Sequence, residues 1–157
     1  MSEALQKFAD SARRYCAWCE GPAGDAATEM RTAFALVLAL LNAIAAVEQG
    51  RGGGDSQGIP HEDFMKMHRR FASLPFQYYR SEFDPLDLEP EGDGMGDIAD
   101  DLADIWRDLK PPLQLFDSAD FAGAAFEWRY RFGIHWGRHA ASALYPLHCW
   151  LVDNGEA

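Results

Sequence analysis

Two histidines near the carboxyl end of the chain are the residues whose spacing most directly suggests chemistry. His135 and His139 lie four positions apart, so on a helix both imidazole rings would point to the same spot. They fall on a stripe that is otherwise apolar and aromatic at helical spacing. A buried imidazole needs hydrogen-bond partners, and its own helix supplies none. The other members of this stripe are Phe121, Ala125, Trp128, Phe132, Trp136 and Ala143.

Carboxylates are crowded on a second predicted helix. Asp101 and Asp108 border its apolar face, whereas Asp100 lies almost opposite. Like charges at these spacings destabilise a helix by roughly a few tenths of a kcal/mol per pair. The preferred interpretation is a solvated acidic face that aids solubility. The alternative is a divalent-cation site, because oxygen ligands suit Mg²⁺ and Mn²⁺. The crowded residues are Asp97, Asp100, Asp101, Asp104 and Asp108.

The two groups together define one candidate polar site with two interpretations. In the preferred one, an aspartate (Asp101 first, Asp104 or Asp108 next) hydrogen-bonds to a histidine and holds the helices in register. In the other, histidine nitrogens and aspartate oxygens bind a divalent metal, the one cofactor considered. Its ligands would then be Asp101, Asp104, His135 and His139. The whole candidate site comprises Asp101, Asp104, Asp108, His135, Trp136 and His139.

The elements that must position these residues are all helices. Apolar residues recur at helical spacing over most of the chain, which predicts an all-α, single-domain bundle of about five or six helices spanning 1–157. The second and last helices should form its centre, the acidic helix should end at Pro111-Pro112, and a bend or break is expected in the last helix. A flexible loop near 50–59 and an irregular acidic segment near 77–96, without strands, complete the prediction. The expected helices cover about 3–20, 25–49, 60–75, 97–110 and 119–153, with Ser118 capping the last.

Composition limits the function classes. The net charge of -11 repels phosphate backbones and anionic membrane surfaces, so we expect neither nucleic acid nor a membrane as partner. Met1-Ser2-Glu3 leads directly into a charged amphipathic segment, so we expect no signal peptide. Three cysteines do not indicate a disulfide framework, and a cytoplasmic location is expected.

Several motifs together resemble a known family. They are 82–85 (Glu-Phe-Asp-Pro), 101–110 around Trp106, Trp128 with Phe132, and 135–139 (His-Trp-Gly-Arg-His). This part of the chain, Pro75 to His148, resembles a bacterial all-α family catalogued as the domain of unknown function numbered five thousand and sixty-three. The resemblance implies a compact helical domain in a small bacterial protein, without an established activity, substrate or cofactor.

Two functional classes remain after these exclusions. The preferred prediction is a small non-enzymatic domain that binds a protein or a small molecule. The alternative is a divalent-metal-dependent hydrolase of phosphorylated compounds, with Asp101, Asp104, His135 and His139 as ligands and a bound water as nucleophile. Neither predicts an oligomeric state.

Overall fold

The computed structural model describes the chain except for residues 51, 54–55, 82–85 and 88–93, and it confirms the all-α prediction. The motif predicted at 82–85 lies outside the described residues, as do parts of the expected loop near 50–59 and of the acidic segment near 77–96. The elements are α1 (Glu3–Glu20), α2 (Ala26–Ile44), α3 (His61–Arg70), β1 (Tyr78–Ser81), β2 (Gly94–Asp97), α4 (Ile98–Asp117), α5 (Phe121–Arg131), the π-helical turn η1 (Phe132–Trp136) and α6 (Gly137–Asp153).

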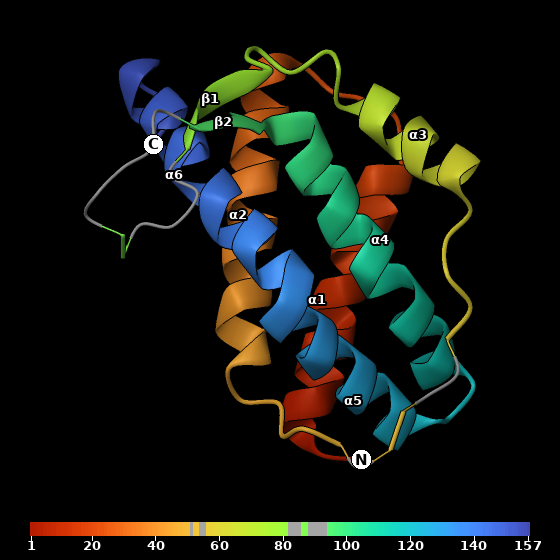
Figure 1. Cartoon of the computed structure of the whole chain (residues 1–157). Helices are drawn as coiled ribbons and strands as arrows, with labels where there is room; N and C mark the ends of the chain where they lie inside the picture. The colour runs from red at the N-terminus through yellow and green to blue at the C-terminus, as the bar shows by residue number, and fades with distance from the viewer. Residues whose placement is uncertain (51, 54–55, 82–85, 88–93) are drawn as a thin grey trace.

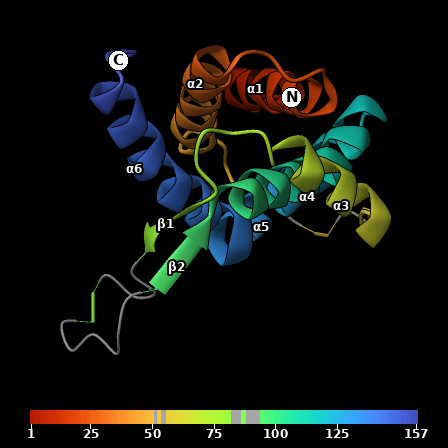
Figure 2. The same cartoon turned by 90° about the horizontal axis from the view of Figure 1, so that it is seen from above.

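The helices pack in two layers (Figures 1 and 2). Helices α1 and α2 form one layer, and α4 with the long α5–η1–α6 rod forms the other. Helix α3 lies beside α4, and the short β1–β2 hairpin lies where α4 begins. This arrangement places α4 next to η1 and α6, the two helical segments that carry the histidines.

Helix α4, rather than the predicted α2, is the central helix. It contacts α1, α3, α5 and α6, and apolar residues such as Leu102, Ile105 and Leu109 are completely buried. Helix α2 buries mainly one stripe, including Met30, Val37 and Leu40, and leaves Leu38 half exposed. The error came from the composition of α2, which is apolar on nearly every side although only one side faces the core. By length and composition alone, α2 is also apolar enough to cross a membrane, a property that core helices share.

Helix α4 does not end at Pro111-Pro112 as predicted, but continues to Asp117. A proline inside a helix removes a backbone hydrogen bond. Here both prolines are buried, and the apolar face continues beyond them with Leu113 and Phe116. Burial of these side chains offsets the missing hydrogen bonds. Ser118 lies at the carboxyl end of α4, and the next helix is instead capped by Asp120, whose side chain accepts from the Gly123 N–H.

The β1–β2 hairpin corrects the prediction that 77–96 contains no strand. Its two strands are antiparallel, with Tyr79 opposite Gly96. The ring of Tyr79 lies so close over Gly96 that a Cβ atom there would be 2.2 Å from it. Because Gly96 has no side chain, the ring of Tyr79 can lie across strand β2. Two four-residue strands give too weak a pattern to detect by alternation.

The bend or break predicted in the last helix corresponds to the π-helical turn η1, which changes the helical pattern between α5 and α6 without separating the two helices. A Cβ atom on Gly137 would lie 2.4 Å from the carbonyl oxygen of Phe132, five residues earlier. The wider turn therefore requires glycine at this position. Such turns commonly occur at functional sites, and this one carries His135. Pro146, by contrast, is accommodated inside α6.

Candidate metal centre

Three aspartates on α4 face the histidine-bearing segments. Asp101, Asp104 and Asp108 follow one another at helical spacings of three and four residues, so they share one face of the helix. All three are buried. The solvated acidic face preferred from the sequence is therefore wrong for these three residues.

His139 is held by the first of these aspartates. Its Nδ1 lies 2.7 Å from Oδ1 of Asp101, while the other oxygen, Oδ2, accepts a hydrogen bond from the hydroxyl of Tyr79. Burial and the hydrogen bond to Asp101 raise the pKa of Tyr79 well above its ordinary value, so Tyr79 acts as the donor. Since Asp101 offers only acceptor oxygens, Nδ1 of His139 must carry the hydrogen.

His135 is held in the same way by the last aspartate. Its Nδ1 lies 2.7 Å from Oδ2 of Asp108, and Oδ1 of Asp108 lies 3.4 Å from Nη1 of Arg131. Arg131 also donates from Nε to Glu127 and from Nη2 to Ser56. Both histidines therefore have Nδ1 engaged with a carboxylate that a third residue holds in place.

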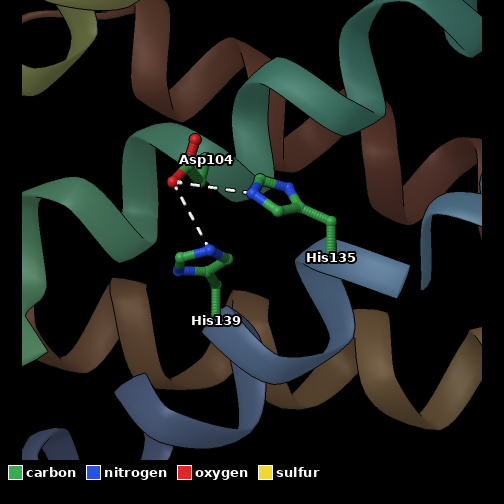
Figure 3. Close-up of side chains that lie close together, drawn as sticks. All are labelled: Asp104, His135 and His139. Atoms are coloured by element: carbon green, nitrogen blue, oxygen red, sulfur yellow. Dashed lines mark ion pairs between the residues drawn. The ribbon is translucent and has the colours of Figure 1, made fainter. Parts of the chain in front are cut away.

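The remaining ring nitrogens converge on the middle aspartate (Figure 3). Oδ2 of Asp104 lies 3.4 Å from Nε2 of His139 and 4.0 Å from Nε2 of His135. The two ring centroids are 4.7 Å apart. Donor atoms about 2.1 Å from a tetrahedral Zn²⁺ lie about 3.4 Å from one another, and the three donor atoms here lie within 4.8 Å of one another. The three side chains could therefore hold one metal ion after small movements.

Arg107 is the cation next to this cluster. Its Nη2 lies 2.6 Å from Oδ1 of Asp104 and 3.4 Å from Nε2 of His135. The contact with Asp104 is an ion pair without directed hydrogen-bond geometry, because Oδ1 has no hydrogen-bond donor among the described residues. A buried carboxylate without a directed hydrogen bond is costly.

Burial and charge shift the protonation of the two central groups. Burial raises the pKa of Asp104, although Arg107 and the two histidines act in the opposite direction. For His139, burial lowers the pKa, but the hydrogen bond to Asp101 and the charges of Asp104 and Asp101 outweigh it, so the pKa is raised. Asp104 and His139 therefore each keep a proton to higher pH than isolated side chains would. Burial disfavours the charged form of the carboxyl group, and the neighbouring carboxylates favour the charged form of the imidazole.

The predicted site residues separate into three groups. Asp104, His135 and His139 supply the converging donor atoms, while Asp101 and Asp108 bind the histidines from behind. Trp136 lies outside the cluster in the core, where its indole N–H donates to the Trp128 carbonyl.

The other acidic residues of this helix region lie apart from the converging atoms. Asp97 caps α4 by accepting from the Ala99 and Asp100 N–H groups. Asp100 itself is partly exposed.

Three residues around the cluster were not assigned to it from the sequence. Arg107 stands three positions after Asp104, a spacing that indicates an ion pair and could have identified it. Arg131 belongs to a group of arginines near the histidines that could pair with the acidic helix, and it does contact Asp108 on that helix. Tyr79 could not be found, since it depends on an unpredicted strand.

These features define a mostly helical protein with a histidine–aspartate cluster between two packed helical segments. The chain belongs to the family described as domain of unknown function DUF5063, whose model matches residues 1–153. Its structure is similar to the crystal structure of protein BF1032 from Bacteroides fragilis, with a TM-score of 0.75, 19% identity and 95% of each chain covered. At this identity the similarity shows the fold alone. No curated protein matches the chain.

Proposed function

We propose that this protein binds a divalent transition-metal ion through Nε2 of His135, Nε2 of His139 and the carboxylate of Asp104. The observation that carries the proposal is the orientation of the two rings. Each Nδ1 is bound to an aspartate at 2.7 Å, so each Nε2 faces Asp104 and, in the neutral form of the ring, offers it a lone pair. Lone pairs that converge on a carboxylate repel one another unless a proton or a metal lies among them.

The surroundings of the rings support the same proposal. Metal-binding histidines commonly donate their second N–H to a carboxylate, which fixes the tautomer and strengthens the ligand. Asp101 and Asp108 have this position for His139 and His135. Asp101, predicted as a ligand, is therefore proposed as a residue that orients a ligand. Two imidazoles and one carboxylate suit Zn²⁺ or Fe²⁺ better than Mg²⁺.

The proposal is tested by adding metal to the full chain and measuring the melting temperature. At 100 times its dissociation constant, one bound ion stabilises the fold by about 2.7 kcal/mol, which corresponds to about 5–10 °C for a domain of this size. We expect this increase with Zn²⁺ in the wild type and its loss in His135→Gln. His148→Gln is the matched control, because His148 is exposed on α6.

Metal content decides the same question independently. Protein purified without chelator and without an affinity-tag metal should contain about one ion per chain. Absence of metal together with an unchanged melting temperature after addition of Zn²⁺ or Mn²⁺ would refute the proposal. The cluster would then be a set of structural hydrogen bonds.

A second candidate function is metal-dependent hydrolysis. It is favoured by the number of ligands, since three protein ligands leave a coordination position for water, as in catalytic zinc sites. The side chains of His135 and His139 are 34% and 23% exposed, so solvent has access. Hydrolysis of p-nitrophenyl phosphate by the Zn²⁺-loaded wild type, and not by His135→Gln, would support this function. Binding of metal without turnover would favour the non-enzymatic binding domain.

A further inference from the structure

Arg107 touches two of the three proposed ligands. Its Nη2 is within 3.4 Å of both Oδ1 of Asp104 and Nε2 of His135. Any further ligand bound to an ion between these atoms would therefore come within reach of the guanidinium group.

The guanidinium group of Arg107 is held in place by the protein, but only part of its N–H donors contact the described residues. It stacks over the ring of Phe64, with 4.8 Å between Cζ and the ring centroid, and its side chain remains 37% exposed. Among the described residues, its polar contacts are made by Nη2. Its other N–H groups are therefore available to a ligand from solvent.

Arg131, which contacts the aspartate that binds His135, differs from Arg107 in how many of its donors the protein engages. Its Nε, Nη1 and Nη2 contact Glu127, Asp108 and Ser56 respectively. This guanidinium group is already committed to orienting the protein's own carboxylates, so it offers little to a ligand. Within the part of the chain that the structure describes, Arg107 keeps N–H donors that contact no protein acceptor.

From this placement we infer that the proposed metal centre takes an oxyanion, a phosphate or carboxylate group, held between the metal ion and Arg107. The planar guanidinium fork matches the oxygen pairs of both groups. The surface is otherwise strongly acidic, with a net charge of -11, so an anion needs local positive charge to bind. The metal ion and Arg107 supply that charge side by side. This inference rests on the proposed metal binding.

The experiment uses the full chain loaded with Co²⁺, whose visible absorption reports changes in coordination. Wild type, Arg107→Gln, Arg107→Lys and Arg138→Gln are each titrated with inorganic phosphate and, separately, with acetate. Arg138 is the matched control, because it is exposed next to His139 in sequence and its removal changes the net charge equally.

We expect phosphate or acetate to shift the spectrum of the wild type saturably. Loss of a charge-assisted hydrogen bond should weaken this binding on the order of 10- to 100-fold in Arg107→Gln. Arg107→Lys should fall between the two, because it keeps the charge and loses the fork. Arg138→Gln should stay within about threefold of the wild type, since exposed charges are screened. Tighter binding of phosphate would identify a phosphorylated ligand, and tighter binding of acetate a carboxylate.

The outcomes separate this inference from the metal site itself. Co²⁺ uptake by wild type and Arg107→Gln, with equal anion affinity in both, would overturn the role of Arg107 and leave the metal site standing. Co²⁺ uptake without any spectral response to either anion would also overturn it. Failure of the wild type to take up Co²⁺, seen before any anion is added, would refute the proposed function and this inference with it.

Discussion

His139 donates its Nδ1 hydrogen to Oδ1 of Asp101 across 2.7 Å, and this bond determines which ring nitrogen faces Asp104. The same relationship between His135 and Asp108 turns a second Nε2 toward the same carboxylate. A purely structural role, which holds the helices in register, would need only the hydrogen bonds that the two Nδ1 atoms make to Asp101 and Asp108. The convergence of the opposite nitrogens is the part that a purely structural role does not require.

Asp104→Asn should abolish metal binding with little effect on the metal-free fold. The amide keeps the shape of the side chain and removes a carboxylate that burial destabilises, as its raised pKa indicates. The substitution also removes the ion pair with Arg107, which is partly exposed and worth about 0–1 kcal/mol. We expect the metal-free stability to stay within about 1 kcal/mol of the wild type, and the increase in melting temperature with Zn²⁺ to disappear. Asp100→Asn, on the same helix, should retain that increase. A full response of Asp104→Asn to Zn²⁺ would remove Asp104 from the ligand set.

Tyr79→Phe should weaken metal binding by about 10-fold or more, although Tyr79 is not a proposed ligand. It holds Asp101, which orients His139, and loss of such supporting partners commonly reduces metal affinity 10–100-fold. Calorimetric titration with Zn²⁺ measures the change. The neighbouring Tyr78→Phe is the control, because Tyr78 is 62% exposed. Equal affinities in the two variants would show that the Tyr79 hydroxyl does not support the site.

Gly137→Ala should destabilise the protein by about 1–3 kcal/mol, because the new methyl group would overlap the carbonyl and ring of Phe132. The π-helical turn would have to shift, and His135 with it, so Zn²⁺ binding should weaken as well. Gly133→Ala is the control, since nothing lies within 4 Å of a Cβ atom there. It should be neutral or stabilising by about 0.5–1 kcal/mol. Denaturant unfolding of both variants checks this prediction, and similar midpoints would contradict it.

The metal-free protein should lose stability as the pH rises above neutrality. Burial lowers the pKa of His139, but its hydrogen bond to Asp101 and the nearby carboxylates raise it overall. The folded state therefore binds this proton more tightly than the unfolded chain. The resulting stabilisation is complete below about pH 6.5 and is lost as the pH rises through the raised pKa. Denaturant unfolding at several pH values should show this decline in the wild type and less of it in His139→Gln.

Zn²⁺ should stabilise the protein more strongly over the same rise in pH. The metal and the proton compete for Nε2 of His139, so metal binding improves as the proton is lost. The raised pKa of Asp104 acts with the same sign above its ordinary value of 3.8. A metal-induced increase in melting temperature that does not depend on pH would contradict this competition.

The sequence predicted the structure best where apolar residues recur at helical spacing over many residues. Helix α1 matches its predicted limits, and the paired aspartates and histidines were correctly expected to meet across two helices. The pattern failed where burial overrides local preference, as at Pro111-Pro112, and where a segment is short, as in the β1–β2 hairpin. It also could not separate the proposed ligand Asp104 from Asp101, three positions earlier, because their proposed roles depend on which nitrogen of each histidine ring faces them. Trp136 shares the histidine stripe but is completely buried in the core, where its indole N–H donates to the Trp128 carbonyl.

X-ray diffraction from crystals soaked in Zn²⁺, recorded on both sides of the zinc absorption edge, would show whether His135, His139 and Asp104 bind a metal ion together. We predict one anomalous peak about 2.0–2.2 Å from Nε2 of His135, Nε2 of His139 and an oxygen of Asp104. The hydrogen bonds from Nδ1 to Asp101 and Asp108 should remain. Absence of a peak among these three side chains, at a Zn²⁺ concentration that occupies other sites on the surface, would show that they do not form a zinc site.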